Sequence, residues 1–160
     1  MGFRQDGIAR EELAGRFPPR ERLERGPCAV IECLEEIPCN PCEEACPTGA
    51  ITVGSPITNI PRLDPEKCVG CGVCVGVCPG LAIFLVDLSP GRGRARLTVP
   101  HEMLPVPEVG EEVELLGRDG TVLERGKVVR KHRFGTTWAI TVELPAELIQ
   151  EVRAVRSLRG

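Results

Sequence analysis

Short apolar runs separated by Gly, Pro and polar residues dominate the first half of this chain. Residues 29–31, 50–53, 59–63 and 81–87 have the length and the β-branched content of strands. A cysteine-rich loop with a short helical turn lies between the first and second of these strands, and another lies between the third and fourth. The repeated order of strand, loop with helix, and strand predicts an α+β fold with a pseudo-twofold.

The second half is β-rich and contains no cysteine after residue 78. Residues 112–116 and 121–130 alternate apolar and polar positions on either side of Gly117-Arg118-Asp119-Gly120, and Asp-Gly is a strong hairpin signal. We expect another strand at 138–143, a helical turn at 145–149 and a closing strand at 152–155. Together these elements predict a small antiparallel, β-barrel-like domain.

These patterns divide the chain into an N-terminal arm (1–27), a cysteine-bearing domain (28–88), a linker (89–100) and a β-rich domain (101–160). The arm holds an amphipathic candidate at 8–13, and it is either a solvated tail or a segment that orders against a partner. The linker is basic and turn-rich at 89–94. A nucleic-acid patch there would lack the interleaved aromatic residues that stack on bases.

Composition places the chain among globular proteins, because 42% of its 160 residues are hydrophobic and 27% are charged. The first residues are charged and lack the apolar core of an export signal, and the longest apolar run, 81–86, is far shorter than the roughly 20 residues of a membrane span. Nine clustered cysteines, an odd number, favour metal ligation in a reducing cytoplasm over disulfides.

The net charge of −3 hides an acidic middle segment. Residues 28–88 hold eight acids against two bases, a balance of −6 before any bound group is counted. Phosphate binding requires a positive surface, so we expect a protein partner with a basic patch and no nucleic acid. The acids are Glu32, Glu35, Glu36, Glu43, Glu44, Asp64, Glu66 and Asp87, and the bases are Arg62 and Lys67.

The strongest chemical signal is the run from Cys68 to Pro79, in which Cys68, Cys71, Cys74 and Cys78 follow the pattern C-x2-C-x2-C-x3-C-P. This is the spacing of a bacterial iron–sulfur site, in which the fourth cysteine binds a second cluster. Gly70 and Gly72 allow the tight coil of backbone that such a loop needs. The coil also directs amide N–H groups toward the sulfurs, which offsets buried negative charge.

A related run lies 32 residues earlier. Cys39, Cys42 and Cys46 precede Cys71, Cys74 and Cys78 by this constant interval, and 47–51 matches 79–83 as well, which indicates an internal duplication. The position three before Cys39 is Glu36, so we expect Cys33 to reach the cluster across a loop lengthened by three residues.

If the fourth cysteine of each run binds the cluster of the other run, the eight cysteines form the ligands of two [4Fe-4S] clusters. Cys68, Cys71, Cys74 and Cys46 would hold cluster 1, and Cys33, Cys39, Cys42 and Cys78 would hold cluster 2. Three alternatives remain open. Zinc could occupy CxxC pairs, although a zinc ribbon needs only four cysteines; a [3Fe-4S] centre could form at the displaced Cys33; and Cys28 could replace Cys33. Strand alternation favours Cys33, because Cys28 should face the same way as Val30 and Glu32.

Residues 33–51 and 68–83 resemble the bacterial-type 2[4Fe-4S] ferredoxin family, which implies one-electron transfer. The segments 37–43, 100–105 and 145–153 also resemble small ferredoxin-like subunits of multi-subunit flavin-dependent dehydrogenases that oxidise proline, hydroxyproline or sarcosine. This second resemblance implies partner subunits that carry the flavin and the catalytic site, in a hetero-oligomer.

The chain itself shows no acid–base pair, nucleophile or phosphate-binding loop, and His101 and His132 are isolated. We therefore expect an electron-transfer subunit without a catalytic site, which relays single electrons between a partner's flavin and another acceptor. A diffusible ferredoxin and a structural or regulatory iron–sulfur module are the alternatives.

Overall fold

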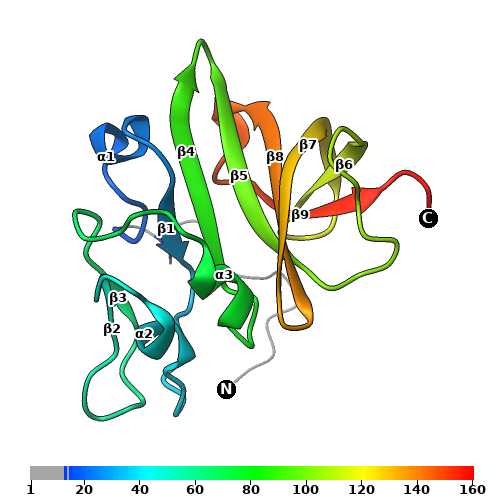
Figure 1. Ribbon diagram of the computed structural model, residues 1–160. Helices are drawn as coiled ribbons and strands as arrows, with labels where there is room; N and C mark the ends of the chain where they lie inside the picture. The colour runs from blue at the N-terminus through cyan, green and yellow to red at the C-terminus, as the bar shows by residue number, and fades with distance from the viewer. Residues whose placement is uncertain (1–12, 14) are drawn as a thin grey trace.

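The computed structural model describes residue 13 and residues 15–160 (Figure 1). Within these residues a seven-stranded antiparallel sheet has the strand order β1-β4-β5-β8-β7-β6-β9, and a two-stranded sheet pairs β2 with β3. The strands are β1 (Cys28–Ile31), β2 (Ile51–Thr52), β3 (Arg62–Leu63), β4 (Ile83–Gly91), β5 (Arg94–His101), β6 (Glu112–Gly117), β7 (Val122–Phe134), β8 (Thr137–Pro145) and β9 (Val152–Ser157).

The helices are short. They are α1 (Arg20–Glu24), α2 (Pro41–Ala45), α3 (Val73–Val77) and the 3-10 turn η2 (Ala146–Leu148). In Figure 1, α2, β2 and β3 lie together at one end of the molecule, and α3 lies beside the lower part of β4. No helix in the described part of the chain is both long and apolar enough to cross a bilayer.

Most predicted elements are confirmed. The Asp119-Gly120 turn joins β6 to β7, which pair antiparallel from Glu112 with Lys127 to Leu116 with Val122. The closing strand is β9, and it pairs with β6. The two cysteine loops each carry one helix, and the strands around them follow the expected order.

Strand β4 is longer than predicted and belongs to two apolar cores. Its side chains alternate between a core shared with β5 to β9 and a core beneath the cysteine loops. Strand β1 alternates in the same way, with Cys28 and Val30 on one side and Ala29 and Ile31 on the other. A strand covered on both faces must be apolar throughout, which explains the continuous run at 81–86.

Residues 89–100, expected to be a linker, are part of the large sheet. The end of β4 and the whole of β5 form a hairpin that turns at 92–93, where Arg92 and Gly93 both have positive φ. Gly91 pairs with Arg94 across this turn. The Pro-Gly-Arg-Gly segment is therefore a hairpin tip, and β1 and β4 continue one sheet from the cysteine-bearing part into the β-rich part.

The hydrogen-bonded strand order of the described residues is open, with β1 and β9 at the two edges. Strand β9 approaches β5 across the sheet without pairing with it. The sheet is thus strongly curved, and a closed β-barrel stays a prediction.

Residues 20–27 of the predicted arm pack on their own chain. Leu23 is fully buried, and the guanidinium of Arg22 donates hydrogen bonds to four backbone carbonyls, those of Gly26, Pro27, Pro65 and Cys68. This part of the arm supports the second cysteine loop. Residues 8–12 of the amphipathic candidate lie outside the described residues.

The packing predicted around the cysteines needs one correction. Ile31, Ile51, Val53 and Ile83 are buried as expected, but the side chain of Val69 is 61% exposed and Val73 and Val77 are half-buried. Val75, which lies between these two in α3, is fully buried instead. A five-residue helix turns one narrow face to the core, and its direction depends on how the helix docks, which periodicity over so few residues does not reveal.

Candidate metal centre

The two cysteine loops have closely similar backbones at their ends. Helix α2 ends at Cys46 with φ −72° and ψ 113°, and α3 ends at Cys78 with φ −67° and ψ 113°. In both loops the chain therefore leaves the helix in an extended conformation. The last cysteine of each loop is turned away from the cysteines before it, as exchange of fourth ligands requires.

A first cavity is surrounded by Cys46, Cys68, Cys71 and Cys74. Three of these come from the second loop and one from the end of α2. Apolar side chains complete the wall, among them Ala29, Ile51, Leu63 and Leu85.

A second cavity is surrounded by Cys33, Cys39, Cys42 and Cys78. Here the first loop supplies three cysteines and the end of α3 supplies the fourth. Ile31, Ile37 and Ile83 are among its apolar neighbours. The structure thus brings the eight predicted ligands together in the two predicted groups of four, and their ligation of iron stays a prediction.

Backbone amides point at the cysteine sulfurs in equivalent places. The N–H of Ala50 donates to Cys46 Sγ at 3.3 Å, and the N–H of Ala82, 32 residues later, donates to Cys78 Sγ at 3.5 Å. Ala29 N–H donates to Cys68 Sγ at 3.4 Å. Such hydrogen bonds stabilise negative charge on thiolates and sulfides. The four thiols and the amide donors of each cavity fit a [4Fe-4S] cluster.

Burial makes bare thiolates costly at these positions. It raises the pKa of Cys42 to about 11 and the pKa of Cys74 to about 12. A thiolate in such a place needs a cationic partner, and iron supplies one when a cluster is bound.

Cys28 lies next to the first cavity without lining it. A hydrogen bond that the Cys28 thiol donates to Cys68 raises the pKa of Cys28 and lowers the pKa of Cys68 to about 5. Cys28 packs with Val30 in the core of the large sheet, on the face predicted from strand alternation. Cys33, in contrast, lines the second cavity. The geometry favours Cys33 as the fourth member of its group and makes Cys28 a buried neighbour of Cys68.

The glycines of the second loop have the roles predicted for them. Gly70 has φ +69° and Gly72 has φ +83°, and a Cβ atom at Gly70 would lie 2.4 Å from the carbonyl oxygen of Pro27. Only glycine avoids this clash while keeping a left-handed backbone.

No three His, Cys, Asp or Glu side chains in residue 13 and residues 15–160 surround one point closely enough to hold a single metal ion. A tetrahedral zinc site, with Zn–S bonds of about 2.3 Å, would need such a group.

The two histidines lie away from both cavities. His101 is 3% exposed and pairs with Trp138 across β5 and β8, and burial lowers its pKa. His132 is exposed on β7 and lines a separate groove. No local sequence pattern marks this groove, because its residues come from four strands and a loop and only the strand order brings them together.

Comparison with known proteins agrees with the cysteine pattern. Residues 37–82 match a family model described as a 4Fe-4S dicluster domain. This range contains seven of the eight predicted ligands and leaves out Cys33. The match covers less than half of the chain and identifies this segment as a ferredoxin-type [4Fe-4S] segment.

Three curated relatives illustrate the range of similar proteins. One subunit of an ion-translocating oxidoreductase complex from Methanosarcina acetivorans is 49% identical over 49 residues, which are 31% of this chain and 17% of that protein. An uncharacterised ferredoxin of Methanocaldococcus jannaschii is 44% identical over 45 residues, 28% of each chain. Protein Pixie of Drosophila melanogaster is 29% identical over 103 residues, 58% of this chain and 16% of that protein.

The chain thus spans less than a third of the length of each of these three relatives. No solved structure gives a significant match to it. The resemblance to subunits of flavin-dependent dehydrogenases stays a prediction.

Proposed function

We propose that this chain is an electron-transfer subunit that binds two [4Fe-4S] clusters and relays single electrons between the flavin of a partner dehydrogenase and another acceptor. When bound, each cluster supplies a one-electron redox couple. The protein holds the clusters close together, limits access of water to them and presents them to its partners.

The observation that carries the proposal is the exchange of cysteines between the two cavities. Each cavity takes three thiols from its own loop and the fourth from the helix end of the other loop. The two sites therefore share both helices, α2 and α3, which pack against each other. Such sharing keeps two clusters at a short, constant separation, as a relay requires.

Each cavity also has an exposed apolar residue at its rim. Val69 lines the first cavity and is 61% exposed, and Ile37 lines the second and is 42% exposed. Exposed apolar residues beside buried redox centres suit transient contact with a donor at one site and an acceptor at the other. The first residue after β3, Asp64, and the acids Glu35 and Glu36 keep these surroundings negative.

The test is anaerobic purification from the native source, with iron, sulfide and flavin analysis of all co-eluting chains. We expect about eight irons and eight sulfides per chain, together with stoichiometric flavin on larger partner subunits. Zinc in place of iron would refute the proposal. Eight irons without any flavoprotein would refute the partner and support the diffusible ferredoxin.

Cysteine variants test the ligand groups. Cys46→Ser should change the electron paramagnetic resonance signal of one reduced cluster and Cys78→Ser that of the other. Cys28→Ala is the matched control, and it should retain the full iron content because Cys28 lines neither cavity. Loss of a cluster in Cys28→Ala with full iron content in Cys33→Ser would reverse the assignment of these two residues.

A structural or regulatory module would use the clusters only for shape. Its activity in the complex would persist when the clusters are held in one oxidation state, whereas a relay would stop. Activity of the complex, measured with clusters that are free to change oxidation state and with clusters poised in one oxidation state, separates these two functions.

A further inference from the structure

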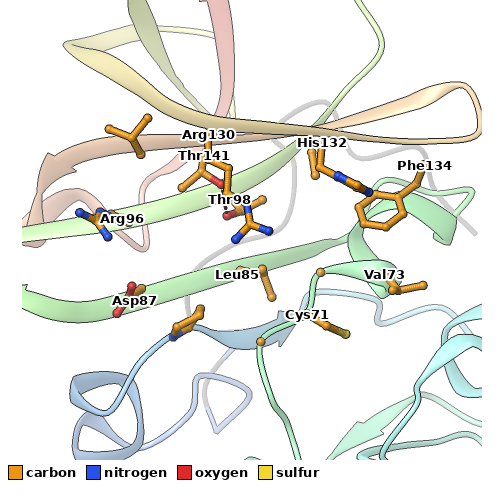
Figure 2. A pocket seen from close by; sticks show the side chains of 15 residues that line it. Cys71, Val73, Leu85, Asp87, Arg96, Thr98, Arg130, His132, Phe134 and Thr141 are labelled. Atoms are coloured by element: carbon orange, nitrogen blue, oxygen red, sulfur yellow. Dashed lines mark hydrogen bonds between the residues drawn. The ribbon is translucent and has the colours of Figure 1, made fainter. Parts of the chain in front are cut away.

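A groove of about 510 Å3 lies between the second cysteine loop and the face of the large sheet (Figure 2). Its floor is formed by β4, β5, β8 and β7, and one wall is the segment 70–73, which includes the predicted ligand Cys71. The volume lies within the range of small-molecule sites, roughly 300–1,000 Å3. The groove shares Cys71, Gly72 and Leu85 with the first cluster cavity, but its charged residues, its histidine and its two threonines line neither cluster cavity.

Strand register explains why these residues share one face. Leu85 pairs with Thr98, Thr98 with Thr141, and Thr141 with Arg130, so that one row crosses all four strands. A second row begins with Asp87 opposite Arg96. The hydroxyls of Thr98 and Thr141 are hydrogen-bonded to each other at 2.7 Å. The floor is therefore an ordered surface built from regular strands.

The polar end of the groove carries excess positive charge. Neither the guanidinium of Arg96 nor that of Arg130 makes a hydrogen bond or ion pair with any described residue. The carboxylate of Asp87, 9% exposed, accepts a hydrogen bond from Ser89 N–H at 2.9 Å. Glu143, which pairs with Arg96 across β5 and β8, already forms an ion pair with Arg94 at 3.6 Å. The two unpartnered arginines are thus available for an anion.

The other end of the groove is apolar and aromatic. Phe134 and His132 form an edge-to-face pair with ring centroids 4.5 Å apart, and Val73 and Leu85 lie near them along the groove. Figure 2 shows Val73, His132 and Phe134 at one end, Arg96 and Asp87 at the other, and Cys71 beside Leu85 between them. An occupant that filled the groove would contact apolar side chains, a cluster ligand and two arginines together.

We propose that this groove binds a planar aromatic compound with an anionic phosphate or carboxylate group. Arg96 and Arg130 bind the anionic group, and the ring system packs against Leu85, His132 and Phe134 beside Cys71. Guanidinium groups form paired, charge-assisted hydrogen bonds with such anions, and aromatic rings pack edge to face or offset against one another. This site adjoins the first cluster cavity, with which it shares Cys71, Gly72 and Leu85, whereas Arg96, Arg130 and His132 line neither cluster cavity.

Flavin mononucleotide and riboflavin are the matched probes, because they share one ring system and differ by a phosphate. The choice of a flavin rests on the proposed function, whereas the site itself rests on the groove. Anaerobically purified, cluster-loaded protein is titrated with each compound, and quenching of flavin fluorescence measures the binding. We expect flavin mononucleotide to bind at least tenfold more tightly than riboflavin.

Single variants identify the groups that bind each part of the ligand. Arg96→Ala and Arg130→Ala should each weaken flavin mononucleotide binding about tenfold and leave riboflavin binding unchanged. His132→Ala should weaken the binding of both compounds to the same degree. All three side chains are exposed, so the iron and sulfide contents should stay at the wild-type values.

Arg125→Ala is the control, since Arg125 is an exposed arginine of the same strand, β7, and does not line the groove. Its affinity for both compounds should equal that of wild type. The proposal would be overturned if the two flavins bound equally tightly, or if neither bound at millimolar concentration. It would also be overturned if Arg125→Ala and Arg130→Ala weakened the binding of flavin mononucleotide equally. Full iron and sulfide contents in the same samples would show that the clusters are intact when the groove proposal fails.

Discussion

Arg153 Nε donates a hydrogen bond to Oε1 of Glu32 at 2.7 Å, although the two residues are 121 positions apart in the sequence. Glu32 follows β1 and directly precedes Cys33, and Arg153 lies on β9. Arg118 makes a second ion pair with the same carboxylate. The guanidinium of Arg153 also lies 4.9 Å from the ring centroid of Phe84. This buried cluster ties the first cysteine loop to the β-rich half.

Glu32→Gln should lower the free energy of unfolding by about 3 kcal/mol, because it leaves two arginines without their counter-charge in a buried place. Both side chains of the Glu32–Arg153 pair are less than one-tenth exposed. Thermal or denaturant unfolding of the cluster-loaded protein measures the loss. Glu66→Gln is the control, since the exposed pair of Glu66 with Arg25 should contribute less than about 1 kcal/mol. Equal effects of the two substitutions would contradict the role of the buried cluster.

Arg22→Gln should also destabilise the protein, by about 2–4 kcal/mol, since it removes hydrogen bonds to carbonyls that have been shielded from water. Arg22 is 8% exposed, and one of its four acceptors is the carbonyl oxygen of Cys68. The backbone amides of the second cysteine loop should therefore be the first to lose protection from hydrogen exchange, and measurement of exchange at residues 66–72 would detect this. Arg20→Gln, at the exposed start of the same helix, should have little effect. Unchanged exchange in Arg22→Gln would refute the anchoring role.

The duplicated loops differ at one strained position. Gly49 has φ +68°, and its counterpart 32 residues later, Leu81, has φ +53°. A left-handed backbone costs a non-glycine residue about 1–2 kcal/mol, and glycine loses roughly 0.5–1 kcal/mol more chain entropy on folding. Leu81→Gly should therefore change stability by less than about 1 kcal/mol, whereas Gly49→Leu should destabilise by about 1–2 kcal/mol.

Paired unfolding curves of Leu81→Gly and Gly49→Leu test this asymmetry. The rest of each turn is the same, because Gly49 N–H donates to Cys46 O at 3.4 Å and Leu81 N–H to Cys78 O at 3.2 Å. If Leu81→Gly lowered the free energy of unfolding as much as Gly49→Leu, the side-chain packing of Leu81, and not its backbone angle, would decide the stability of this turn.

Removal of iron should unfold the two halves to different extents. The core beneath the cysteine loops contains fewer large apolar side chains than the core of β5 to β9, and its cysteines are predicted cluster ligands. The core of β5 to β9 is formed mainly by Leu, Ile and Val. Folding of a small metal-bound core is coupled to metal binding. Treatment with an iron chelator should therefore abolish amide protection in residues 33–81.

The same chelated sample provides the internal control. Amides of β5, β7 and β8, which pair along most of their length, should keep at least part of their protection. Complete loss of protection throughout the chain would show that the large sheet depends on the clusters for its stability.

The sequence predicts those features whose signal is carried by neighbouring residues. The interval between cysteines limits which thiols can surround one small cluster, and Asp119-Gly120 specifies a hairpin whatever its surroundings. Alternation along β1 placed Cys28, Val30 and Glu32 on one face, and Val30 and Cys28 do share a core. Within α3 the sequence did not identify Val75 as the buried valine, because the docking of a one-turn helix depends on distant segments, and Val69, in the loop before α3, is exposed.

The amino-acid sequence by itself determined the two cysteine groups, the order of the strands along the chain and the turns between them, since each depends on spacing within a few tens of residues. Only the tertiary structure decided that β4 belongs to both cores, that Glu32 meets Arg153, and that Arg96 and Arg130 face Cys71 across a groove. These relationships follow from the order and curvature of the sheet. Strand order is decided by the total burial of apolar surface over the whole chain, which no local pattern records.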